Sequence, residues 1–193
     1  MSPSKRTHRR WRSRLRGNAI RFAAESSGMA AVEFAMIAPV MIILYFGVVE
    51  IADGYDASTK ASAVASTAAD LIAQEKVVCD AEMTDAFAAL NAIMFPFSPN
   101  NMEIRISSLI DNGNGTVKVA WSDAQNATPR DVNASIEIPS GLVTTGGSVI
   151  LAEVKYTYNS PTPHFFPTPR PMNDRYYLHP RKVDQIGRQT ACT

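Results

Sequence analysis

The hydrophobic pattern of the chain is dominated by one long apolar segment near the N-terminus, SSGMAAVEFAMIAPVMIILYFGVVEI, residues 26–51. Sixteen consecutive residues, Phe34 to Val49, carry no charge, and residues 29–51 contain only two charged side chains. A helix of 23 residues is about 35 Å long, which is enough to cross a hydrocarbon core of roughly 30 Å. The pattern therefore predicts a transmembrane helix over residues 29–51, interrupted by Pro39, which membrane helices tolerate. The alternative is a buried core helix, but the rest of the chain is small for enclosing a helix that is apolar all round.

After this segment the pattern takes a helical period. Residues 52–76 predict a helix with the apolar stripe Ala57, Ala61, Val64, Ala68, Leu71 and Ile72. The pair Asp53-Gly54 is expected to loosen the junction of this helix with the membrane span. Asp80 is the expected N-cap of a second helix, which ends at Pro96. One face of that helix would carry Met83, Phe87, Leu90 and Met94.

Alternation replaces the helical period from residue 102 onward. The stretches MEIRI and TVKVAW, with the turn cluster DNGNG between them, predict a β-hairpin with Val117, Val119 and Trp121 on one face. ASIEIP predicts a short strand, and residues 148–158 predict the longest one, with one face formed by Ile150, Ala152, Val154, Tyr156 and Tyr158. Residues 160–172 are rich in proline and read as a loop, and RYYLHPR reads as a last edge strand. Helices followed by strands predict an α+β fold with a small, mostly antiparallel sheet.

Charge changes this picture by giving the membrane helix a direction. Of 19 basic and 18 acidic residues, eight and one lie in residues 1–28, so the remainder has a net charge of −6. The positive-inside rule keeps the basic segment 1–28 in the cytoplasm and sends residues 52–193 across the membrane. A basic arm can also indicate nucleic-acid binding or nuclear targeting, but an adjoining membrane span makes topology the better explanation. No nucleic-acid partner is expected.

The segment fits a secretory signal peptide poorly. Such a signal has an apolar region of 7–15 residues that precedes its small-residue cleavage site. Here the apolar run is longer, and the plausible cleavage point, Gly28, lies before it. An uncleaved anchor remains an alternative, although it accounts for neither Gly28 nor Glu33.

A basic leader that ends in glycine, followed by four residues, a glutamate and an aromatic residue, resembles the type IV prepilin signal. The matching residues are Gly28, Met29, Glu33 and Phe34. The resemblance implies that a prepilin peptidase cuts after Gly28 on the cytoplasmic face, which makes Met29 the new N-terminus. Glu33 would then pair, within an assembled bundle, with the α-ammonium of a neighbouring subunit. The alternative is that Glu33 extends to the membrane interface.

Within that class, the segment from Gly28 to Ile51 resembles the TadE-like proteins of tight-adherence (Flp-type) pili. It shares their Val-Glu-Phe-Ala opening, a proline after a few apolar residues, and an aromatic-Gly-x-x-Glu element, here Phe46-Gly47-Val48-Val49-Glu50. A more diffuse resemblance continues through AVASTAADLIAQEKVV, VKVAWS, IPSGLV, ILAEVKYTY and HPR. The resemblance implies a minor pilin or assembly component whose partners are the prepilin peptidase, the major pilin and other minor pilins.

The two cysteines, Cys79 and Cys192, both follow the membrane span. An even number of cysteines in an exported domain predicts a disulfide. Two independent free thiols are the alternative.

Known catalytic motifs are absent from the sequence. It contains no Gly-x-Ser-x-Gly, no P-loop and no His-Glu-x-x-His, and DNGNGT lacks the oxygen ligands of a calcium loop. We therefore expect no enzyme, no metal and no cofactor.

The sequence as a whole predicts three parts: a basic cytoplasmic leader (1–28), a transmembrane helix (29–51), and a periplasmic α+β domain (52–193) that contains the Pro-rich loop 160–172. The predicted protein is a minor pilin of the inner membrane that is cut after Gly28, with the extracellular pilus as its second expected location. The alternative is an uncleaved, membrane-anchored periplasmic scaffold for pilus or secretion machinery.

Overall fold

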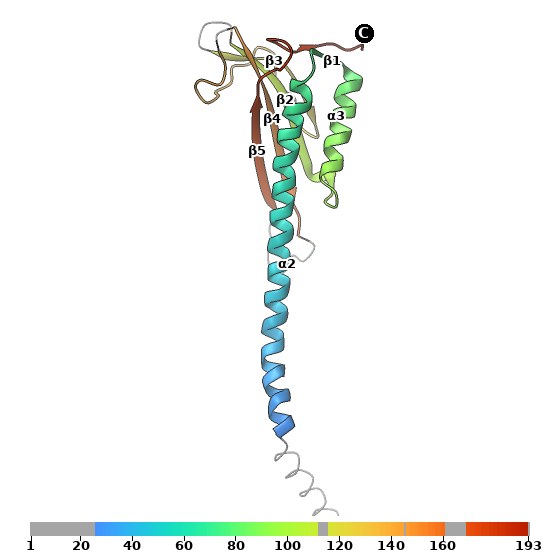
Figure 1. Cartoon of the computed structure of the whole chain (residues 1–193), viewed down its shortest axis with the longest axis vertical. Helices are drawn as coiled ribbons and strands as arrows, with labels where there is room; N and C mark the ends of the chain where they lie inside the picture. Colours follow the sequence, from blue (N-terminus) through green and yellow to red (C-terminus); the bar gives the residue numbers. More distant parts are fainter. Residues whose placement is uncertain (1–25, 112–115, 145, 161–168, 193) are drawn as a thin grey trace, which may run out of the picture. The chain divides into compact units, whose positions relative to one another are not determined.

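The structure is a computed structural model that describes residues 26–111, 116–144, 146–160 and 169–192 (Figure 1). The predicted leader up to residue 25, the turn at 112–115 and residues 161–168 of the Pro-rich segment lie outside the described residues. The chain divides into two compact units, Met1–Val49 and Glu50–Thr193.

Helix α2, Ser26–Ala73, supplies all of the described structure in the first unit and continues into the second. The expected loosening at Asp53-Gly54 is wrong, because the helix is continuous through both residues. A β-carbon built on Gly54 would lie 3.8 Å from Cε1 of Tyr158. Because 3.8 Å is an ordinary van der Waals distance, an alanine would also fit at this position. The glycine therefore neither interrupts the helix nor is required by the neighbouring ring.

The second unit is built on a four-stranded antiparallel sheet with the order β3-β2-β4-β5. Its strands are β2 (Met102–Asp111), β3 (Val117–Gln125), β4 (Ser148–Tyr158) and β5 (Arg170–Leu178). Part of α2 and helix α3 (Asp80–Ile93) pack on one face of this sheet (Figure 1). The α+β architecture with an N-terminal apolar helix, a second helix and an antiparallel sheet is therefore confirmed.

The main core lies between the two helices and the sheet. It contains the alanine-rich face of α2, which allows the helix to approach the sheet closely, and the predicted face of β4 from Ile150 to Tyr158. Five residues of the predicted helical stripe are buried, whereas Leu71 is 37% exposed and lies outside the core. On α3 and just after it, Met83, Leu90 and Met94 are buried as expected, and Phe87 packs at the edge.

The start of α3 differs from the prediction by one residue. Cys79, not Asp80, is the N-cap, with extended backbone angles. The Glu82 carboxylate accepts a hydrogen bond from the Cys79 amide at 2.9 Å, which satisfies one backbone donor at the helix end. Asp80 is the first helical residue, where its charge favours the positive end of the helix dipole.

The hairpin of β2 and β3 contains a β-bulge that the alternation of the sequence did not predict. Ser108 pairs with Trp121 and Leu109 pairs with Val119, so Ala120 is an extra residue on β3. Because one inserted residue reverses the alternation, Trp121 packs in the main core whereas Val119 lies in a second cluster on the other face. The expectation that Val117, Val119 and Trp121 share a face is therefore wrong.

The second cluster covers part of the opposite sheet face. It consists of Leu109, Val119, Val149 and Leu151, against which the connection between β3 and β4 packs with Ala134, Ile136, Ile138 and Val143. The predicted strand ASIEIP is not a strand, because its ladder contact is the isolated bridge from Ser135 to Lys118. Its apolar side chains Ala134, Ile136 and Ile138 nevertheless pack against the sheet.

Strand β5 begins at Arg170, inside the segment expected to be a loop, and ends at Leu178. It is an edge strand, as RYYLHPR predicted, but it starts earlier than that stretch. The sequence missed a second sheet, in which β1 (Val77–Val78) pairs in parallel with β6 (Gly187–Arg188). The remaining short element is the 3-10 turn η1, Pro99–Asn101.

Candidate functional site

The predicted cleavage residues lie in the first turns of α2. Gly28 has no other group within 4 Å of a β-carbon built on it, and Met29 is 70% exposed. The surrounding fold therefore does not explain why position 28 is glycine.

Glu33 and Phe34, the predicted assembly residues, follow on the same exposed helix. Glu33 is exposed and lies four residues after Met29, which is about one helical turn. Phe34 is 72% exposed. The helix thus brings all four predicted processing and assembly residues onto two adjoining turns, while their roles in cleavage and assembly stay predictions.

The apolar segment of α2 is the one helix among the described residues that is long and apolar enough to cross a membrane. Only 6% of its most apolar window is buried inside the protein. The core helix of a soluble protein would be mostly buried, so the exposure of these apolar side chains favours the membrane interpretation over the core-helix alternative.

Glu50 behaves unlike the apolar residues before it. It closes the aromatic-Gly-x-x-Glu element, it is the first residue of the second unit, and only 2% of it is exposed. Sequence reasoning did not name it as a site residue. The available signal was its position at the boundary between an apolar run and a polar domain.

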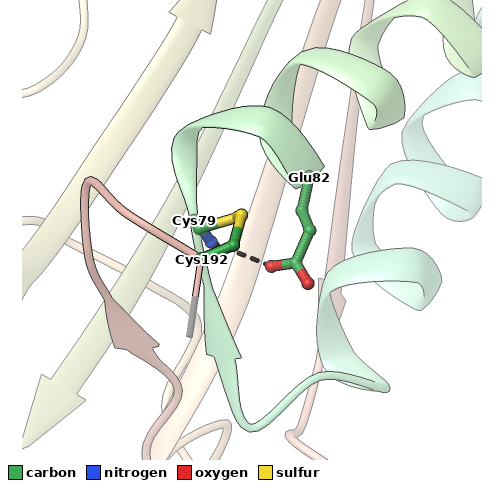
Figure 2. Close-up of side chains that lie close together, drawn as sticks. All are labelled: Cys79, Glu82 and Cys192. Atoms are coloured by element: carbon green, nitrogen blue, oxygen red, sulfur yellow. Dashed lines mark hydrogen bonds between the residues drawn. A yellow bond between two sulfur atoms is a disulfide. The ribbon is translucent and has the colours of Figure 1, made fainter.

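Cys79 and Cys192 form a disulfide with a Cα–Cα distance of 5.2 Å, 113 residues apart in the sequence (Figure 2). The predicted bridge is therefore present. Glu82 lies beside it, and its carboxylate oxygen lies within 4.8 Å of both sulfur atoms. Two thiolates and a carboxylate can bind a metal ion, but here both sulfur atoms are bonded to each other. The bridge instead joins the start of α3 to the C-terminal segment.

Arg188, a residue of β6, holds the same C-terminal segment through ion pairs and hydrogen bonds. Its guanidinium donates to Asp123 at 2.8 and 3.0 Å and forms an ion pair with Asp80 at 2.6 Å. It also donates to the backbone oxygen atoms of Val78 and Gln189. The hydrogen bond to Asp123, then that to Asp80, raises the pKa of Arg188 above its usual value, so the side chain is a permanent cation.

We expect Arg188→Gln to lower the free energy of unfolding by about 1.5–3 kcal/mol, the usual range for hydrogen bonds to charged groups. The guanidinium is only 19% exposed, so solvent screens it weakly. The measurement is denaturant unfolding of the full chain in detergent, followed by circular dichroism. The control is Lys155→Gln, since its pair with Glu103 is about half exposed and should contribute less than about 1 kcal/mol. Equal losses in the two variants would contradict the prediction.

The uncovered part of the opposite sheet face carries a charge cluster. Arg105, Arg130 and Arg175 all pair with Glu153, at 3.4, 2.6 and 3.2 Å. An open groove of about 600 Å³ lies beside it. Glu153 is 14% exposed, and three cations compensate its burial. The cluster links β2, β4, β5 and the loop after β3.

One comparison with known proteins gives a match. Residues 28–70 match the family of TadE-like proteins. No curated protein and no solved structure matches the chain. The matched residues begin at the predicted leader glycine and include the whole apolar segment. They also extend past Ile51 into the part of α2 that packs on the sheet, where the sequence resemblance was more diffuse.

The resemblances proposed further along, from VKVAWS to HPR, lie outside the match and stay predictions. Over residues 28–70, from the predicted leader glycine through most of helix α2, this chain is similar to the TadE-like proteins.

Proposed function

We propose that this protein is a minor pilin of a tight-adherence pilus, cut after Gly28 and acting in pilus initiation or assembly. TadE-like proteins are associated with that pilus, which supports the general role. The proposed topology is a single pass of the inner membrane, with the N-terminus in the cytoplasm and the domain Glu50–Thr193 in the periplasm. The role is structural and involves no catalysis.

The observation that carries the proposal is the position of Glu33. It lies on the exposed surface of a helix whose next sixteen residues carry no charge. A carboxylate at the centre of a bilayer costs about 2.5–3.5 kcal/mol, and less near the edge. Such a cost is offset when an ammonium group pairs with the carboxylate in an apolar surrounding. Cleavage after Gly28 would create that group at Met29.

The proposed partners follow from these two steps. A prepilin peptidase would act on the Gly28–Met29 bond. The major pilin and other minor pilins would contact the exposed apolar side chains of α2. The α-ammonium of one of these neighbouring subunits would form an ion pair with Glu33. The inner membrane would hold the helix before assembly.

The test is the N-terminus of the protein after coexpression with its own peptidase. We expect wild type to begin at Met29, and Gly28→Val to keep its leader because a branched side chain crowds the scissile bond. The matched control is Gly47→Val, since neither glycine has a neighbour within 4 Å of an added β-carbon. Intact-mass measurement distinguishes the two forms.

A wild-type protein that keeps its first 28 residues in this experiment would overturn the minor-pilin proposal. That result would favour the uncleaved scaffold. Cleavage at Gly28 in wild type and in Gly47→Val, but not in Gly28→Val, would support the proposal.

A further inference from the structure

The second unit contains a cavity of about 310 Å³ beside the start of its helical part. Residues of α2, the end of β4 and the start of β5 line it, together with Ser160 after β4. Its polar groups include a carboxylate, a phenol and a guanidinium, and its apolar walls come from the helix and from β5. The lining residues that matter here are Glu50, Ile51, Tyr158, Arg170 and Met172.

Two of these polar groups are almost completely removed from solvent. Glu50 is 2% exposed and Tyr158 is 6% exposed. The Tyr158 hydroxyl has no hydrogen-bond partner among the residues that the structure describes. Burial, and then the carboxylates of Asp53 and Glu50, raise the pKa of Tyr158, so the phenol stays protonated. A buried phenol without a partner is costly unless a ligand supplies one.

The cavity begins where the apolar segment ends. Val49 is the last residue of the uncharged run, and the residue after it, Glu50, already lines the cavity. Ser58, the furthest lining residue on α2, is eight residues on, about 12 Å along a helix. The polar layer of a bilayer extends roughly 5–8 Å beyond the hydrocarbon on each side. If this segment spans the membrane, the Glu50 end of the cavity lies at the depth of the headgroup layer, and its Ser58 end lies beyond that layer.

We propose that this cavity binds the zwitterionic headgroup of a phospholipid that carries a primary ammonium. The ammonium would donate to Glu50 and to the Tyr158 oxygen, and the phosphate would face Arg170. Ile51 and Met172 would contact the glycerol and the first methylenes of the acyl chains. The proposal rests on the membrane anchoring in the proposed function, but not on cleavage or pilus assembly.

The hydrogen-bonding groups of the cavity favour an ammonium headgroup over the other common phospholipid headgroups. A carboxylate accepts at up to about four positions, so Glu50 can bind an ammonium while it keeps its contacts within the protein. A trimethylammonium has the same charge but no N–H donor. A glycerol headgroup has no positive charge and leaves the phosphate charge to face Glu50. The hydrogen bonds to the ammonium should therefore set the preference.

The experiment is native mass spectrometry of the full chain in detergent. Equal amounts of phosphatidylethanolamine, phosphatidylcholine and phosphatidylglycerol with identical acyl chains are added, and the lipids retained are counted. We expect one phosphatidylethanolamine per chain, held about tenfold or more tightly than the other two, as the loss of charge-assisted hydrogen bonds implies. Glu50→Gln and Tyr158→Phe should each reduce this preference. Asp56→Asn, which changes an exposed carboxylate of the same helix outside the cavity lining, should not.

Circular dichroism checks that each variant folds. Tyr158→Phe removes only a hydroxyl and keeps the ring that packs on Phe97, so it remains informative if Glu50→Gln does not fold. Equal retention of the three lipids, or an unchanged preference in Tyr158→Phe, would overturn the proposal. Binding of free phosphoethanolamine as tight as that of the lipid would overturn the membrane source of the ligand. Because Gly28→Val should bind lipid like wild type, failure of cleavage and failure of lipid binding are distinguishable.

Discussion

Replacing Cys192 with alanine should lower the free energy of unfolding of the domain Glu50–Thr193 by about 4–5 kcal/mol. The bridge to Cys79 closes a segment of 113 residues, and the chain-entropy description assigns a loop of that length about this much stabilisation. The segment that it holds contains a sheet contribution of only two residues, β6. Loss of the bridge should therefore also release the C-terminal residues. The measurement is denaturant unfolding of the full chain in detergent.

The control for the disulfide is the double variant Cys79→Ala/Cys192→Ala. One bond is lost in either case, so the double variant and the single variant Cys192→Ala should differ only by the local effect of trimming buried Cys79, about 1 kcal/mol or less. A reducing agent should destabilise wild type by the same 4–5 kcal/mol and leave both variants unchanged. A loss below about 1 kcal/mol in Cys192→Ala would show that other contacts hold the C-terminal segment without the bridge.

Glu33→Ala should leave the protein in the membrane and reduce its incorporation into pili by about tenfold or more. An apolar residue replaces a carboxylate that is costly in hydrocarbon, so insertion is unchanged or improved. In the proposed assembly, however, the partner ammonium loses its counter-charge, and hydrogen bonds to charged groups contribute about 1.5–3 kcal/mol. The measurements are alkaline extraction of membranes and the amount of this protein in sheared pili.

The controls for Glu33→Ala separate charge from shape. Glu33→Gln keeps the size and removes the charge, so it should fail like alanine. Glu33→Asp keeps the charge on a shorter side chain and should retain part of the activity. If pilus yield is the same in Glu33→Ala and wild type, Glu33 has no role in assembly and only extends its carboxylate to the membrane–water interface.

The stability of the C-terminal segment depends on two restraints that lie close together. The disulfide fixes Cys79, and Arg188 contacts Asp80 and the Val78 carbonyl just beside it. Neighbouring interactions of this kind are rarely additive. In the absence of the bridge, Arg188→Gln should therefore cost less than it does in wild type, because a released segment no longer positions the guanidinium.

Features that depend on local periodicity could be predicted without the structure. Sixteen uncharged residues are enough to identify the apolar segment, and a stripe at spacings of three and four is enough to identify the buried face of α2. The face of β4 from Ile150 to Tyr158 followed from simple alternation. Each of these patterns is set by the geometry of one helix or one strand. The leader motif is likewise a linear pattern, and its cleavage after Gly28 stays a prediction.

Features that depend on residues far apart in the chain became visible in the folded protein alone. The bulge at Ala120 arises from the register between two strands, and it moved Val119 to the other side of the sheet. Strands β1 and β6 pair in parallel although they lie about 110 residues apart in the sequence. Each strand has only two residues, which is too short to show an alternation of polar and apolar positions. Glu50 and Tyr158 line one cavity although 107 residues separate them. Alternation and periodicity report which face a residue occupies, and they carry no information about which distant residue lies opposite.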